Sequence, residues 1–275
     1  MQIDRSPVFA REQSVTLAKL NLLYGNNATG KSALCEWIAG VFQPDYLRRW
    51  ARPRPPLAFR ISYLNPSPIE ISAEILPNGE RRFAIDGQRV PFNPVGIRIL
   101  RLGRPTLDER KSDVYWLANA LDVSRGMIRR LATDVNVFPH AKVRNVRFVQ
   151  MEGKETLCAD VDGTVPGLPL SLLSGRETER VFIEFATAAA RVSGRFHPTL
   201  LILDGCPTIV FEGFFKFYSH HFLDSTNQFQ TIMCIPSREL DLDAVQWDGW
   251  EVIRTVGREP EVNLTQVLRN PRPVQ

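Results

Sequence analysis

One short segment constrains the fold of this 275-residue chain more than any other. It matches G-x-x-x-x-G-K-S, and its residues are Gly25, Asn26, Asn27, Ala28, Thr29, Gly30, Lys31 and Ser32. The apolar run 20–24 before it predicts a buried strand, and residues 33–42 after it predict a helix. Such a turn lets backbone N–H groups surround a phosphate, with the lysine reaching the β- and γ-phosphates and the serine hydroxyl binding Mg²⁺. The sequence therefore predicts a site for ATP and Mg²⁺.

A second motif lies far downstream. Residues 199–204 read Thr-Leu-Leu-Ile-Leu-Asp, an apolar strand that ends in an acid. Downstream of a phosphate loop, a carboxylate in this position holds Mg²⁺ through water, while the apolar run lies in the centre of the sheet. We therefore expect Asp204 and Ser32 to share the metal.

A third motif precedes the predicted helix 176–192. Ser174 and Glu177 have the spacing of a capping box, which by itself would satisfy the free N–H groups of that helix. The same geometry presents N–H donors and a hydroxyl to an anion. Both interpretations are compatible with the sequence.

Together these motifs resemble a known family. Leu173-Ser174-Gly175-Arg176-Glu177 looks like the signature motif of ABC-type ATPases, and residues 15–32 are similar to the opening of the SMC/RecF/OLD-like branch of AAA family ATPases. The resemblance implies an α/β P-loop NTPase fold, ABC/SMC-head-like, with a mixed central sheet, an antiparallel β-subdomain and a helical lid insertion. It also implies a homo- or heterodimer with ATP between the subunits, in which Ser174 and Gly175 act in trans.

The rest of the chain fits one domain over residues 1–275. Alternating runs around Asn78-Gly79 predict antiparallel hairpins, so residues 58–104 form a β-subdomain. The resemblance makes residues 105–135 the helical lid. The sequence predicts a break in this helical stretch near 122–124, and the Arg/Pro-rich stretch 44–57 is expected to be loop. Too few residues separate Ser32 from Ser174 for a long coiled coil, so we expect a compact head.

Three family features are missing. The position after Asp204, where the family has a glutamate that polarises water, is Gly205. We find no glutamine at the end of the strand that reaches residue 102 and no histidine directly after strand 229–235. Positioning the nucleophile contributes about 10²–10⁴-fold in rate, so we expect slow or absent hydrolysis unless Glu212 or a partner supplies the carboxylate. The catalytic residue is therefore unassigned, and the resemblance favours a nucleotide-dependent switch.

The composition and charge of the chain bear on its partners and its location in the cell. The net charge is +4 and the pI about 9.0, with arginines clustered at residues 48–54 and at Arg98, Arg101 and Arg104. These clusters fit a DNA or RNA partner or a solvated surface. Four isolated cysteines (Cys35, Cys158, Cys206 and Cys234), no signal peptide and no apolar run of membrane length favour a cytoplasmic protein without membrane contact.

Residues 117–132 offer a competing interpretation. They resemble a helix-turn-helix in which Arg125, Arg129 and Arg130 would meet DNA, although two lid helices joined by a Ser-capped turn explain the pattern equally well. The family resemblance suggests DNA or RNA repair or antiviral (anti-phage) defence, with a separate effector protein supplying the chemistry. The alternatives are a non-catalytic scaffold or regulatory subunit, and a DNA-binding regulator using residues 117–132.

Overall fold

The computed structural model describes residues 1–51, 56–65, 67–91, 96–103, 112–137, 143–205, 214–236 and 240–268. The chain divides into two compact units. Unit 1 contains Met1–Ile99 and Gln230–Gln275, and unit 2 contains Leu100–Phe229. Within the described part, no helix is both long enough and apolar enough to span a membrane.

A mixed sheet in unit 1 carries the strand that leads into the phosphate loop. That strand, β3 (Leu20–Gly25), is buried along its whole length and runs parallel to both β13 (Phe229–Pro236) and β14 (Glu251–Val256). On the far side of β14, β15 (Asn263–Gln266) pairs antiparallel. The predicted strands over 20–24 and 229–235 are confirmed. Strand β15 and the short helix α6 (Leu242–Trp247) were not predicted.

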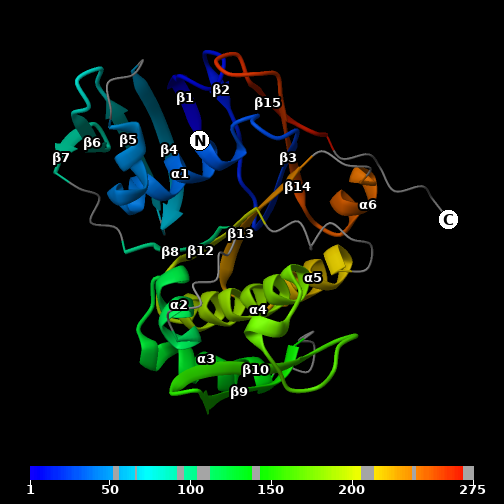
Figure 1. The fold of residues 1–275 in the computed structure, drawn as a ribbon. Coiled ribbons are helices and arrows are strands. Elements are labelled where there is room, and N and C mark those ends of the chain that lie inside the picture. Colours follow the sequence, from blue (N-terminus) through cyan, green and yellow to red (C-terminus); the bar gives the residue numbers. More distant parts are fainter. Residues whose placement is uncertain are drawn as a thin grey trace. The chain divides into compact units, whose positions relative to one another are not determined.

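A second, antiparallel sheet in unit 1 confirms the hairpin predictions (Figure 1). Its strands, in spatial order, are β2 (Gln13–Ser14), β1 (Gln2–Arg5), β4 (Leu57–Asn65), β5 (Ser67–Ile75), β6 (Arg81–Ile85) and β7 (Gln88–Val90). One face alternates into the core through residues such as Phe59, Ile71 and Phe83, and the other face is polar. Gly79 in the β5–β6 turn has a φ of 84°, which explains why glycine occupies this position.

The helix that follows the phosphate loop is anchored by aromatic packing. In α1 (Lys31–Phe42), the fully buried Trp37 lies 5.2 Å from Trp50 and 5.9 Å from Phe59 between ring centroids. Trp50 also donates its indole N–H to the buried Glu36 over 2.9 Å. The prediction of loop over 44–57 was therefore wrong for Pro44–Trp50, which form a 3-10 helix because burial of Trp50 holds the segment against α1.

A central helix organises unit 2. Helix α4 (Gly175–Gly194) contacts its neighbours through side chains around most of its circumference, and even Glu184 and Arg191 are buried. These neighbours are α3 (Arg125–Val137), β9 (Val143–Met151), β10 (Lys154–Val161) and β12 (Thr199–Asp204) (Figure 1). The structure confirms the predicted helix 176–192 and the strand 199–204.

The remaining elements of unit 2 are short or lie at its ends. They are β8 (Arg98–Leu102, in this unit from Leu100), α2 (Asp113–Ala120), β11 (Leu168–Pro169), the 3-10 helix Leu170–Leu172 and α5 (Phe214–Leu223). The predicted break in the helical stretch falls between α2 and α3, where Asp122 has a φ of 50°. Ser124 caps α3 by accepting the N–H of Met127 over 3.2 Å, as the lid interpretation expects.

Candidate nucleotide-binding site

The first residue of the phosphate loop lies against a neighbouring strand. A Cβ added to Gly25 would collide with the hydroxyl and the carbonyl oxygen of Thr255 on β14. Thr29 returns to the same residue, because its hydroxyl lies 2.5 Å from the Thr255 hydroxyl and also donates to the Asn26 carbonyl over 2.8 Å. The loop is therefore closed on itself and attached to β14 through Thr255.

Two positions in the loop have left-handed backbone. Gly30 has a φ of 76°, and an added Cβ would lie 2.6 Å from Val8 Cγ1 and 2.9 Å from Phe9 Cζ. Ala28 has a φ of 61°, although it carries a Cβ and is exposed. An L-residue in this region costs about 1–2 kcal/mol, and such outliers concentrate at functional loops. The turn at Ala28 is therefore imposed by the loop around it.

The start of α1 is open toward the loop. Its N-cap residue is Gly30, no described side chain caps it, and its first turn contains no acidic residue. Ser174, Ser112 and Asp241 cap helices α4, α2 and α6 with their side chains. Because the first N–H groups of a helix attract anions, the start of α1 is suited to a phosphate.

Lys31 places its ammonium group over the same loop. Its Nζ donates to the carbonyl oxygens of Gly25 over 2.7 Å and Asn26 over 2.6 Å. Ser32, next to it, is exposed at the start of α1. The donor set of helix N–H groups, ammonium and hydroxyl is chemically matched to the oxygens of a nucleotide phosphate.

The predicted signature residues belong to unit 2. Ser174 caps α4, with its hydroxyl accepting the N–H of Glu177 over 3.4 Å and its own N–H donating to the Glu177 carboxylate over 2.6 Å. The capping box is confirmed, and Ser174 and Gly175 are both exposed. A role for this pair toward the nucleotide of a second subunit stays a prediction.

Asp204 ends β12 as predicted, but a partner that the sequence analysis missed holds its carboxylate. Arg101 Nη2 lies 2.6 Å from Asp204 Oδ2, and the two side chains are only 16% and 11% exposed. Arg101 therefore belongs neither to a solvated surface nor to a patch open to an anionic partner, as its cluster suggested. Its only sequence signal is its position inside the apolar run of β8.

The two expected Mg²⁺ ligands, Ser32 and Asp204, differ in how well they suit the metal. The exposed hydroxyl of Ser32 is a suitable oxygen ligand, whereas the carboxylate of Asp204 is already neutralised by Arg101 and does not fit the role. In the described part of the chain, no three His, Cys, Asp or Glu side chains gather in a way that could hold a metal. Gly205, the next residue, has a φ of 84° and no side chain to contribute.

The arginines proposed to meet DNA are partly engaged within unit 2. Arg129 donates to both carboxylate oxygens of Glu155, over 3.0 and 2.7 Å, and the guanidinium of Arg125 lies 4.8 Å from the ring centroid of Tyr115. Arg130 is exposed. The helix pair exists as the sequence indicates, and its use in DNA recognition stays a prediction.

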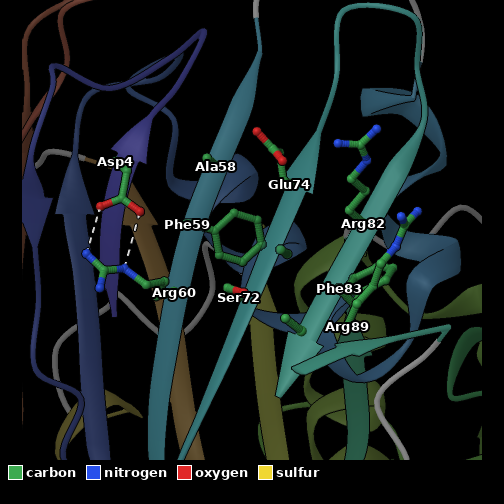
Figure 2. Close-up of a pocket in the computed structure, with 11 residues that line it drawn as sticks. Asp4, Ala58, Phe59, Arg60, Ser72, Glu74, Arg82, Phe83 and Arg89 are labelled. Atoms are coloured by element: carbon green, nitrogen blue, oxygen red, sulfur yellow. Dashed lines mark hydrogen bonds and ion pairs between the residues drawn. The ribbon is translucent and has the colours of Figure 1, made fainter. Parts of the chain in front are cut away.

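The polar face of the antiparallel sheet in unit 1 is hollowed. A depression of about 340 Å³ lies there, and Figure 2 shows Asp4 and Arg60 joined on one side, with Arg82 and Arg89 on the other. Arg60 pairs with Asp4 over 3.1 Å. The other ion pairs beside the hollow are Arg5–Glu74, Arg82–Glu80 and Arg89–Glu80. Because each of these arginines pairs with a carboxylate, with Arg82 and Arg89 sharing Glu80, this face is not a plain phosphate-binding tract.

The structure thus brings residues 25–32 together in unit 1, and it places Ser174, Gly175 and Asp204 in unit 2. Cys35, Cys158 and Cys234 are buried and take part in no disulfide, as expected for small core residues. The positions of Glu212, Cys206, Arg104 and residues 52–55 fall outside the described residues.

Comparisons with known proteins identify the fold. No family model matches the sequence, and no curated protein matches it significantly. An SMC head bound to the C-winged helix domain of ScpA aligns over 97% of this chain and 96% of its own, with 13% identity and a TM-score of 0.67. An SMC head with a coiled coil and joint from Pyrococcus yayanosii aligns over the same shares, with 8% identity and a TM-score of 0.66.

A structure of the recombination mediator RecF with ATP aligns over 97% of this chain and 96% of its own, with 11% identity and a TM-score of 0.54. At such identities the likeness concerns the fold. The chain has the mixed α/β fold of the ABC-type P-loop heads of SMC and RecF, and the fold class predicted from the sequence is confirmed.

Replacing Ala28 by glycine should stabilise the protein by roughly 0.5–1 kcal/mol. The change relieves the left-handed alanine, and the greater freedom of glycine in the unfolded chain offsets part of the gain. Urea unfolding followed by circular dichroism measures the change in the free energy of unfolding. The matched control is Gly30→Ala, which should lower the free energy of unfolding because its Cβ would collide with Val8 and Phe9. Equal or lower stability of Ala28→Gly would contradict a strained loop.

Proposed function

We propose that this chain is an ATP-binding head of the SMC/RecF fold that acts as a nucleotide-dependent switch. The observation that carries the proposal is the loop over residues 25–32. It joins a buried parallel strand to an uncapped helix, and Lys31 lies across its carbonyl oxygens. In this fold the arrangement serves to bind a nucleoside triphosphate.

Slow turnover follows from the residue after Asp204. Gly205 has no side chain that could polarise an attacking water, so this chain does not itself supply the family's glutamate at that position. Bound nucleotide would then persist, and a ligand that favours one state shifts its population without needing hydrolysis. Binding and release of ATP, not rapid cycling, would change the state of the assembly.

The assembly that we propose is a homo- or heterodimer closed through nucleotide. The exposed Ser174 and Gly175 at the start of α4 would face the nucleotide of the second subunit. We assign residues 1–275 to one ABC-ATPase-like domain, with the β-subdomain at 58–104 and the helical lid at 105–135. The basic net charge of +4 and the shared fold support a cytoplasmic nucleic-acid-related complex in repair or antiviral defence, with a separate effector protein.

Lys31→Ala should weaken the binding of a fluorescent ATP analogue by roughly 30- to 160-fold. The loss reflects a charge-assisted contact to the phosphates worth roughly 2–3 kcal/mol. Fluorescence titration measures it, and Lys19→Ala is the control that removes a lysine outside the loop. Equal affinity of wild-type protein and Lys31→Ala would contradict binding at this loop. No binding by either protein would contradict nucleotide binding and favour the scaffold alternative.

Gly205→Glu should raise ATP turnover above the slow rate of the wild-type chain by about 10-fold or more if the missing carboxylate limits the rate. Because Gly205 has a φ of 84°, any side chain there strains the backbone. Gly205→Ala is therefore the matched control, since it carries the strain without the carboxylate. Steady-state phosphate release compares the three proteins. Fast turnover by the wild-type chain would refute the switch.

Ser174→Ala should lower the free energy of unfolding by about 1 kcal/mol. Ser174→Asn should lower it much less, because asparagine also caps helices. If the hydroxyl also closes the nucleotide dimer, both variants should lose ATP-dependent dimerisation in light scattering. Dimerisation that is lost only in Ser174→Ala would indicate that the cap alone matters.

A further inference from the structure

The position of the ion pair between Arg101 and Asp204 favours a lasting interaction. Its two atoms are 2.6 Å apart, on the neighbouring strands β8 and β12, and both side chains are largely withdrawn from water. A guanidinium does not lose its proton under conditions where proteins fold. In such surroundings the attraction between the two charges is much stronger than at a solvated surface.

Apolar packing holds both partners in place. Leu100 and Leu102 flank Arg101 with 1% exposure each, and Leu203 before Asp204 is fully buried. The side chains therefore cannot move apart without disturbing two strands. Separating these two largely buried, opposite charges would also remove the attraction between them, which is unfavourable.

A divalent cation at Asp204 would have to compete with this guanidinium. Mg²⁺ binds through one or two carboxylates together with phosphate oxygens. Here a metal would either sit beside a fixed positive charge or displace it. Gly205 adds no second carboxylate, and the described residues contain no other acidic cluster able to hold a metal.

We infer that Arg101 takes the place of a divalent cation beside Asp204, so that this chain binds nucleotide without requiring Mg²⁺. The inference rests on the proposed function for its nucleotide part. The pair supplies a fixed cation where the motif would otherwise recruit a metal. The sequence motif alone predicts the opposite, because it contains the metal-binding acid and gives no sign of its partner.

Removal of the guanidinium should create a metal-responsive site. Arg101→Met keeps much of the side-chain volume and removes the guanidinium from the carboxylate of Asp204. In the absence of nucleotide, Mn²⁺ or Mg²⁺ at about 100 times its dissociation constant should raise the Tm of this variant by roughly 5–10 °C. The same ions should shift the wild-type Tm by less than about 1 °C, because Asp204 is already paired.

The double variant Arg101→Met/Asp204→Asn is the matched control. It removes both charges, so it should fold and show no metal response. If Arg101→Met shows no more metal response than the wild-type protein and the double variant, the pair is merely structural and the inference is overturned. If Arg101→Met alone does not fold, the wild-type and double-variant measurements below still decide.

Nucleotide affinity provides the second measurement. With a fluorescent ATP analogue, the Kd of the wild-type chain in EDTA should stay within about 3-fold of its Kd in Mg²⁺, and the double variant should behave likewise. Arg101→Met should bind at least about 10-fold more weakly in EDTA than in Mg²⁺. A 10-fold metal requirement in the wild-type chain would overturn the inference and leave nucleotide binding intact. Loss of all nucleotide binding would overturn the proposed function, and the metal-dependent Tm would still test Arg101.

Discussion

The close approach of strand β14 to the end of β3 is the constraint on which the phosphate loop depends. Thr255 occupies the space that a side chain at position 25 would need, and its hydroxyl also meets Thr29 four residues later. Both halves of the turn are therefore attached to one residue of a buried parallel sheet. This attachment explains how the loop maintains a left-handed Ala28 and how the carbonyl oxygens of Gly25 and Asn26 converge on Lys31. The backbone geometry of the loop thus depends on the sheet register.

The sequence predicted what local patterns determine and missed what distant contacts determine. The strand, turn and helix around residues 20–42 follow from periodicity and glycine placement, and the cap at Ser174 follows from a four-residue motif. Arg101 could not be assigned to Asp204, because 103 residues separate them and only the adjacency of β8 and β12 joins them. The 3-10 helix at Pro44–Trp50 was missed for a similar reason, since its stability depends on burial of Trp50 against α1.

Arginine content proved a poor guide to surface charge. The described structure pairs Arg101 with Asp204, Arg129 with Glu155 and Arg60 with Asp4. Arg191, in the middle of α4, is so buried that desolvation lowers its pKa to about 10, which still leaves it charged at neutral pH. A polyanion would have to compete with intramolecular carboxylates for many of these groups, and exposed pairs contribute little to stability. A nucleic-acid partner would therefore gain most from arginines such as Arg130, which are exposed on α3.

Two features at the end of β12, the Arg101–Asp204 ion pair and Gly205, have effects in the same direction. The motif that this segment resembles has two acids in succession, whereas here Asp204 is paired with Arg101 and the next residue is Gly205. The pairing with a guanidinium weakens the attraction of Asp204 for a metal ion, and Gly205 has no carboxylate that could activate water. An anionic nucleotide needs neither group in order to bind a loop of N–H donors and an ammonium. Under the proposed function, this pair and Gly205 would allow nucleotide binding without rapid turnover, and a population shift would then depend on differential affinity alone.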